Sequence, residues 1–212
     1  MRATNVVMLA SLSKDKFSEY QDLFKAYPEF ELKPLSELVF NARHLSDAES
    51  GKTYYENAFI KGQLAHLAVK VPTISDDTGL EVDALNGKPG LRSHRYAIAR
   101  AGETQDMANV KKLLDELKSV PTEKRTARFV CCLIFFVEGL VATVTEKLEG
   151  TLLTEPRGKN GFGYDPLFVP QGSSKTLAEM SSEEKNHISH RAKALRALME
   201  QVKESGVHMV RP

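Results

Sequence analysis

Two adjacent aspartates, Asp76 and Asp77, follow a short apolar run in the segment ISDDTGLEVDALNGKPG. Aspartate is common where a strand gives way to a turn, because its short side chain bonds to nearby backbone N–H groups. A carboxylate held rigidly at a strand end can also bind Mg²⁺, which prefers oxygen ligands and takes few of them from the protein. The pair therefore predicts a strand end followed by a turn, with or without a metal-dependent catalytic site.

The glycine-rich segment GKNGFGYDP could form either a surface loop or a pocket for a base. Glycines let the backbone come close to a flat ligand. Phe162 or Tyr164 could supply a stacking face, and Asp165 or backbone N–H groups could bind the edge of a base. The loop alone does not decide between the two interpretations.

A third polar segment, SSEEKNHISHRAKALRALMEQV, contains a histidine and an arginine at the expected start of a helix. Ser189 can precede this helix as its N-cap, which puts His190 and Arg191 in the first turn. Cations at a helix start oppose the helix dipole. Their position therefore favours a site for an anion or a keto oxygen over two solvated charges.

Two further segments could bind phosphate. ASLSKDK runs from an apolar strand into a helix, with Ser11, Ser13 and Lys16 at the junction. Such junctions are where open α/β sheets bind phosphate groups. ENAFIKG places Lys61 on another helix, although a single lysine is by default a surface residue.

The elements that carry these segments alternate between strands and helices. This order predicts an α/β fold with a mixed sheet and flanking helices. Two long strands in the middle of the chain are expected to form a hairpin, which suggests a second, antiparallel lobe. Asn86–Gly87 predicts a turn. The expected strands are NVVMLAS, EFELKPL, VPTIS, ARFVCCLIFFV and LVATVTEKLEG, the last two joined across Glu138–Gly139, and the expected helices are 14–26, 54–69, 104–118 and 181–204.

Composition limits the possible functions. The 212 residues carry a net charge of +1, with Lys and Arg spread along the chain, so a nucleic acid polymer is not an expected partner. No apolar run reaches the roughly 18 residues of a membrane span, and the first residues do not form a signal peptide. Cys131 and Cys132 would point to opposite faces of a strand, which favours reduced thiols and a cytoplasmic protein.

Taken together, SDDTGLEVDALNGKPG, YYENAFIKG, GFGYDPLF and EEKNHISHRAKAL resemble the signature blocks of the inosine/xanthosine triphosphate pyrophosphatases. The resemblance covers nearly the whole chain, in the family's order. It implies one domain over residues 1–212, an elongated mixed sheet in two lobes with a nucleotide cleft between them, and a homodimer. It also implies Mg²⁺-dependent, house-cleaning hydrolysis of non-standard purine nucleoside triphosphates (ITP, dITP, XTP) to the nucleoside monophosphate and pyrophosphate.

The resemblance further assigns roles to individual residues. Asp77 is implied to be the proton acceptor and a metal ligand, with Thr78 after it as a substrate contact. Contacts to the phosphates and the base are implied for Ser11, Ser13, Lys16, Lys61, Phe162, Gly163, Tyr164, Asp165, Lys185, His190 and Arg191.

The chain departs from the family pattern at two places. The first loop usually reads Thr-Gly-Asn, whereas here it reads Ser11-Leu12-Ser13. Where the family often has an acid, this chain has Ala48, so Glu49 is the expected second metal ligand.

Three alternatives stay open. A Maf-like nucleotide pyrophosphatase would act on modified bases, but the GFGYD and SHR stretches argue against it. A nucleotide-binding module without turnover would explain the altered first loop. A haloacid-dehalogenase phosphatase would need Asp-x-Asp after a strand, and Asp76-Asp77 has the wrong spacing.

Overall fold

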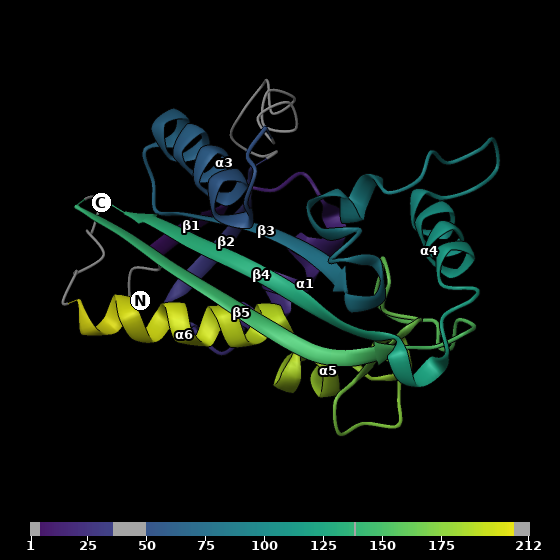
Figure 1. Ribbon diagram of the computed structural model, residues 1–212. Helices are drawn as coiled ribbons and strands as arrows, with labels where there is room; N and C mark the ends of the chain where they lie inside the picture. Colours follow the sequence, from purple (N-terminus) through teal and green to yellow (C-terminus); the bar gives the residue numbers. More distant parts are fainter. Residues whose placement is uncertain (1–4, 36–49, 138, 206–212) are drawn as a thin grey trace. The chain divides into compact units, whose positions relative to one another are not determined.

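The protein has an α/β fold in which a mixed sheet is flanked by helices (Figure 1). This computed structural model describes residues 5–35, 50–137 and 139–205. Within these ranges the strands are β1 (Asn5–Leu9), β2 (Phe30–Pro34), β3 (Thr73–Val82), β4 (Thr126–Val137), β5 (Leu140–Leu152) and β6 (Phe168–Pro170), and the α-helices are α1 (Lys14–Phe24), α3 (Tyr54–Val69), α4 (Gln105–Glu116), α5 (Ser182–Ile188) and α6 (His190–Glu204).

The strands follow the order β2-β1-β3-β4-β5-β6 across the sheet. β1 pairs in parallel with β2 and β3, whereas β5 and β6 are antiparallel. β4 and β5 are neighbours in the sheet with only residues 138 and 139 between them, and Gly139 has a φ of +79°. The mixed sheet and the central hairpin expected from the order of elements are confirmed.

The chain divides into two compact units. Unit 1 comprises Met1–Asp77, Cys131–Glu146 and Arg191–Pro212, and unit 2 comprises Thr78–Val130 and Lys147–His190. β3, β4 and β5 each contribute residues to both units.

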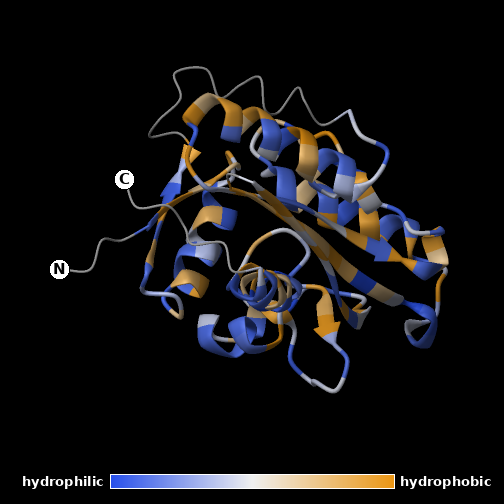
Figure 2. Cartoon of the chain, turned by 90° about the vertical axis from the view of Figure 1, so that its left-hand side faces the viewer, coloured by the Kyte–Doolittle hydropathy of each residue, from blue (hydrophilic) through white to orange (hydrophobic). Residues whose placement is uncertain are grey.

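In unit 1, alternate residues of β4 pack against different helices. Cys131 and Phe135 belong to a core with residues of α1 and α6, whereas Cys132 and Phe136 pack with Ala58 of α3. Both cysteines are buried, free thiols, as expected for neighbours on a strand with two covered faces. Such strands read as continuous apolar runs, as in the segment FVCCLIFFV of β4, and Figure 2 shows orange along parts of the long strands.

Unit 2 has its own core. Leu113 of α4 and Leu117, the C-cap of this helix, are fully buried together with Phe168 of β6, and the ring of Phe129 lies 4.8 Å from that of Phe168. The sequence did not predict β6, because this three-residue strand lies within a Gly/Pro-rich stretch. The predicted helix 104–118 is observed as α4, with Thr104 as its N-cap.

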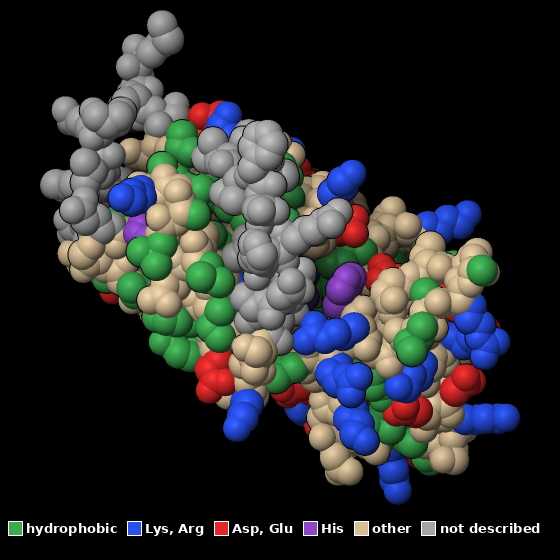
Figure 3. Space-filling view, turned by 90° about the horizontal axis from the view of Figure 1, so that it is seen from above, with side chains coloured by type: hydrophobic (Ala, Val, Ile, Leu, Met, Phe, Trp, Pro, Cys, Tyr) green, Lys and Arg blue, Asp and Glu red, His purple; other side chains and the backbone are tan. Residues whose placement is uncertain are grey.

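The surface carries mixed charges. Figure 3 shows Lys and Arg side chains interspersed with acidic ones, and apolar side chains over α3, where Tyr55, Leu64 and Leu67 are exposed. Of the helices in the described ranges, none is both long enough and apolar enough to cross a membrane.

Candidate active site

Asp76 and Asp77 lie inside β3 rather than at its end. The strand runs without interruption from Thr73 to Val82, so the expectation of a turn directly after the aspartates is wrong. Aspartate is uncommon inside strands, but here cations and an amide satisfy both carboxylates. Because consecutive side chains of a strand point to opposite faces, the two aspartates meet different partners.

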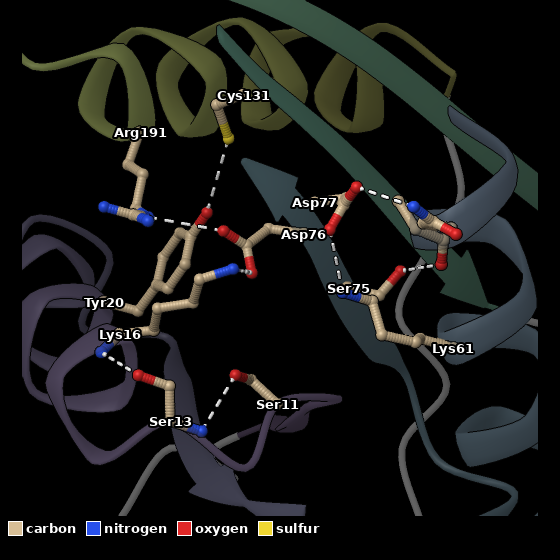
Figure 4. Close-up of polar contacts among 12 residues, drawn as sticks. Ser11, Ser13, Lys16, Tyr20, Lys61, Ser75, Asp76, Asp77, Cys131 and Arg191 are labelled. Atoms are coloured by element: carbon tan, nitrogen blue, oxygen red, sulfur yellow. Dashed lines mark hydrogen bonds and ion pairs between the residues drawn. The ribbon is translucent and has the colours of Figure 1, made fainter. Parts of the chain in front are cut away.

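Asp76 is the centre of a buried ion network in unit 1 (Figure 4). Its Oδ1 lies 3.0 Å from Lys16 Nζ, and its Oδ2 lies 3.3 Å from Nε of Arg191. Arg191 Nη1 lies 3.0 Å from Glu19 Oε2. Burial disfavours the charge on Asp76, yet Lys16, Arg191 and Lys61 outweigh it and hold the pKa of this carboxyl well below its usual range. Asp76 is therefore ionised at neutral pH.

Asp77 faces α3. Its Oδ1 lies 3.2 Å from Lys61 Nζ, and its Oδ2 accepts a hydrogen bond of 3.1 Å from Asn57 Nδ2. Asn57 also accepts the N–H of Gly51 at 2.8 Å, and it is 1% exposed. Thr78, the next residue of β3, is half-buried. The catalytic carboxylate implied by the resemblance therefore lies beside the lysine implied for the phosphates.

The loop between β1 and α1 is held by its two serines (Figure 4). Ser11 Oγ accepts the N–H of Ser13 at 3.2 Å, and Ser13 Oγ caps α1 by accepting the N–H of Lys16 at 3.2 Å. The helix begins at Lys14, so its positive end and the Lys16 ammonium both lie next to this loop. This arrangement is suited to binding a phosphate.

In unit 2 the glycine-rich loop is held by its own acidic residue. Asp165 is 3% exposed, and its Oδ2 accepts the N–H of Phe162 at 3.1 Å and lies 2.7 Å from Lys185 Nζ. Lys185 Nζ also lies 5.1 Å from the centre of the Phe162 ring. Tyr164 is buried and its hydroxyl donates to the carbonyl of Ser93 at 2.9 Å. Of the two aromatic residues, Phe162 is therefore the one available for stacking.

His190 and Arg191 open α6, as expected, and Ser189 directly precedes them as the C-cap of α5. The single helix expected over 181–204 is therefore two helices, α5 and α6. Neither residue is a solvated helix charge. His190 is 1% exposed, and its ring stacks on Phe129 at 4.8 Å and 10°. Arg191 is 4% exposed within the ion network of unit 1.

Two buried polar residues at the site were missed by the sequence reasoning, Glu19 and Asn57. Each lies about one helical turn from a lysine that was identified, Lys16 and Lys61. Residues three or four apart share a helix face, so this spacing was the signal that could have found them.

The metal-binding potential of the site rests on Asp77. In residues 5–35, 50–137 and 139–205 no group of three or more His, Cys, Asp or Glu side chains is arranged so that it could hold a metal ion. Glu49, the expected second ligand, lies outside these residues. A single carboxylate fits Mg²⁺, which keeps most of its coordination shell in water and phosphate oxygens.

This chain is similar in sequence to proteins of a known family. A family model described as the Ham1 family matches residues 7–201. A dITP/XTP pyrophosphatase of Bacillus cereus is 42% identical over 209 residues, covering 96% of this chain and 98% of the relative. Another from Bacillus subtilis is 41% identical over 192 residues, covering 90% and 93%.

Solved structures of related proteins share the fold. The Staphylococcus aureus Ham1 protein matches with a TM-score of 0.77 and 34% identity, over 95% of this chain and 100% of that one. A nucleoside-triphosphatase / dITP/XTP pyrophosphatase from Mycobacterium abscessus matches with a TM-score of 0.67 and 34% identity, over 93% and 99%. The chain belongs to the Ham1 family, and the resemblance seen in its signature blocks is confirmed.

Proposed function

We propose that the protein hydrolyses non-standard purine nucleoside triphosphates to the nucleoside monophosphate and pyrophosphate. The observation that carries this proposal is the position of Asp77, between Lys61 and Asn57, in a chain whose relatives are named dITP/XTP pyrophosphatases. It is a hydrolase of nucleotide metabolism.

In the reaction we propose, a water molecule attacks the α-phosphorus and the bond from this phosphorus to the α–β bridging oxygen breaks. Asp77 accepts the proton of the water, and pyrophosphate leaves. Asp77 would also hold Mg²⁺, which supplies charge neutralisation for the triphosphate and the leaving group. Lys61, Lys16 and the Ser11–Ser13 loop bind the phosphate oxygens.

The base is bound, in the same proposal, by residues of the glycine-rich loop. Phe162 supplies the stacking face, and the pair of Asp165 and Lys185 supplies polar contacts. Their distance of 2.7 Å supports a preorganised polar group, and the Phe162 ring is only half-buried.

The base also determines which substrates are accepted. Hypoxanthine and xanthine present an oxygen at C6 and a protonated N1, whereas adenine presents an amino group and a bare N1. A site that hydrogen-bonds the first pattern leaves buried groups unpaired with the second, which can discriminate by roughly 10⁴-fold. Guanine shares O6 and N1–H, so GTP is expected to be the best of the poor substrates.

The test is a turnover panel of ITP, dITP, XTP, GTP, ATP and a modified pyrimidine nucleoside triphosphate with Mg²⁺, in which the products are separated. We expect nucleoside monophosphate and pyrophosphate, with ITP and XTP strongly preferred. Equal kcat/KM for ITP and ATP would overturn this specificity. Preference for modified pyrimidines would favour the Maf-like alternative, and nucleotide binding without products would favour a binding module.

Three further properties belong to the proposal. We expect a homodimer, which light scattering can test, and a cytoplasmic location, which two buried free thiols support. We also expect the whole chain, residues 1–212, to act as one domain, because the strands of the sheet contribute to both units.

A further inference from the structure

The glycine-rich loop of unit 2 has a backbone that cannot fix its own shape. Gly161 and Gly163 have φ angles of +72° and +63°, and glycine populates this region without penalty but also leaves it easily. The position of the loop must therefore come from hydrogen bonds to other groups. Asn160 Nδ2 donates to the carbonyl of Met180 at 2.9 Å near the start of the loop, and Lys185 bonds Asp165. Three further side chains act on the turn around Gly163 itself.

Two of these side chains belong to the loop itself. Asp165 accepts the N–H of Phe162, and the Tyr164 hydroxyl donates to the carbonyl of Ser93. A Cβ atom on Gly161 would lie 2.1 Å from Asp165 Oδ2, so the carboxylate packs directly against the loop backbone. These bonds shape the turn and fasten one side of it.

The third side chain comes from a different element, 57 residues earlier in the chain. Asp106 lies in the first turn of α4, and its Oδ2 accepts the N–H of Gly163 at 2.7 Å. Hydrogen bonds to a carboxylate are shorter and stronger than those between neutral groups. The α4 N-terminus also favours a negative charge at this position.

The same face of α4 also holds the carbonyl of Ser93, to which the Tyr164 hydroxyl donates. Asn109, three residues after Asp106, donates to the carbonyls of Ser93 and His94 at 3.2 and 3.0 Å and accepts the N–H of Ala97 at 2.9 Å. α4 thus fixes both the loop, through Asp106, and the carbonyl that holds the Tyr164 hydroxyl, through Asn109.

We propose that Asp106 is a positioning residue for base recognition. It does not touch the nucleotide, and it acts by holding Gly163 so that Phe162 and Asp165 meet the base in one geometry. The inference rests on the proposed function, because the loop is assigned to the base there. It makes α4 part of the specificity apparatus.

The experiment compares Asp106→Ala and Asp106→Asn, with Asp115→Ala as the matched control. Asp115 is an exposed acid on the same helix, so it controls for the loss of one charge. The measurements are kcat and KM for ITP and ATP, thermal stability, and inhibition by inorganic tripolyphosphate, a probe that has the phosphates but no base.

In Asp106→Ala we expect the KM for ITP to rise about tenfold and the ITP-to-ATP ratio of kcat/KM to fall by a similar factor, as for loss of one charge-assisted hydrogen bond. We expect kcat for ITP and inhibition by tripolyphosphate to stay near wild type. Asp106→Asn keeps an acceptor oxygen, so we expect its KM for ITP and its ITP-to-ATP ratio of kcat/KM to stay close to the wild-type values. Asp115→Ala should resemble the wild type.

An unchanged KM for ITP in folded Asp106→Ala would overturn the inference, as would an equal weakening of tripolyphosphate binding, which indicates a general structural effect. If Asp106→Ala does not fold, Asp106→Ser decides by the same criteria, since its hydroxyl is too short to replace the carboxylate. A wild-type protein that does not prefer ITP to ATP would instead refute the proposed function, whatever the variants do.

Discussion

At the scale of single residues, Asp76 and Asp77 are neighbours with different chemistry. Asp76 is fully buried between Lys16 and Arg191, while Asp77 is 7% exposed between Lys61 and Asn57. Removing one partner from a buried ion pair is costly because the other charge stays uncompensated. Asp76 is therefore suited to holding the site together, and Asp77 to meeting a water or a metal.

The variant Asp77→Asn tests the chemical role. The amide would keep the shape of the side chain but lose the charge that accepts a proton, so we expect kcat for ITP to fall by about 10³-fold. The fold and much of the nucleotide affinity, measured by circular dichroism and calorimetry, should be preserved, although the unfolding midpoint should fall because Lys61 loses its counter-charge. Near-normal turnover would remove Asp77 from its central role.

The variant Asp76→Asn tests the ion network. Because Lys16 and Arg191 would lose a buried counter-charge, we expect the free energy of unfolding at pH 7 to fall by about 3–5 kcal/mol. Urea denaturation measures this change. The direct effect on the chemical step should be smaller than that of Asp77→Asn, and a variant as stable as the wild type would contradict the network's role.

The pH dependence of stability gives a second test of Asp76. Its pKa is lowered in the folded protein, so its stabilisation is fully present above the unfolded value of about 3.9 and is lost as the pH falls towards the folded value. We expect wild-type stability to decline below about pH 4. In Asp76→Asn this acid-dependent contribution should be missing, which urea midpoints measured from acidic to neutral pH can show.

At the scale of elements, the start of α1 decides how the phosphate loop is presented. Ser13 is the N-cap of this helix, and asparagine caps helices about as well as serine. Ser13→Asn should therefore leave the unfolding midpoint nearly unchanged and lower the KM for ITP, because the family's usual residue adds an amide. A tenfold or greater loss of kcat/KM would instead indicate a loop fitted to serine.

The packing of α3 against β3 depends on a residue without a side chain. A Cβ on Gly62 would lie 2.4 Å from Ser75 Oγ and 2.3 Å from the Phe136 ring. Alanine gains about 1 kcal/mol of helix propensity over glycine, but overpacking a core costs about 1–3 kcal/mol. We expect Gly62→Ala to be destabilised in urea titrations and to lose activity, since Ser75 is close to Asp77 in the same strand.

The sequence predicted most elements but not all of their ends. The helix 54–69 was predicted with its observed bounds from the spacing of Ala58, Leu64, Ala65 and Ala68. The structure adds what ends it, with Thr53 as the N-cap and Lys70 at a φ of +53°. The predicted end of β3 was too early. The preference of aspartate for strand ends is local, and it takes no account of cationic side chains on distant elements. Only the tertiary structure reveals that Lys16 and Arg191 make a buried aspartate tolerable inside a strand.

The same limit applies to the site. The motif resemblance identified Asp77, Lys61 and the glycine-rich loop, because each of them lies within one of the signature blocks. It did not identify Asp106 or the pairing of Glu19 with Arg191, because the partners lie 57 and 172 residues apart. The spacing from Lys16 could mark Glu19 as a neighbour of the site but not reveal this pairing. Pairings over such separations leave no local pattern in one sequence.

At the scale of the whole molecule, the metal should matter for turnover and little for folding. Asp76 and Asp77 are already paired with cations, so no uncompensated carboxylates of this pair await a metal. A metal bound near its dissociation constant adds less than about 1 kcal/mol. We expect chelation by EDTA to abolish ITP hydrolysis, Mg²⁺ to restore it, and the melting temperature to shift by only a few degrees. Full activity in EDTA would contradict the Mg²⁺ assignment.

The division of the chain into two units has a consequence for the history of the gene. The chain changes unit between residues 77 and 78, 130 and 131, 146 and 147, and 190 and 191, so neither unit is one continuous stretch of coding sequence. A single genetic crossover between two relatives can never exchange one unit intact. It always joins part of one parent's core to part of the other's. We therefore expect single-breakpoint chimaeras of two relatives to be less stable than variants that carry the same number of scattered surface substitutions.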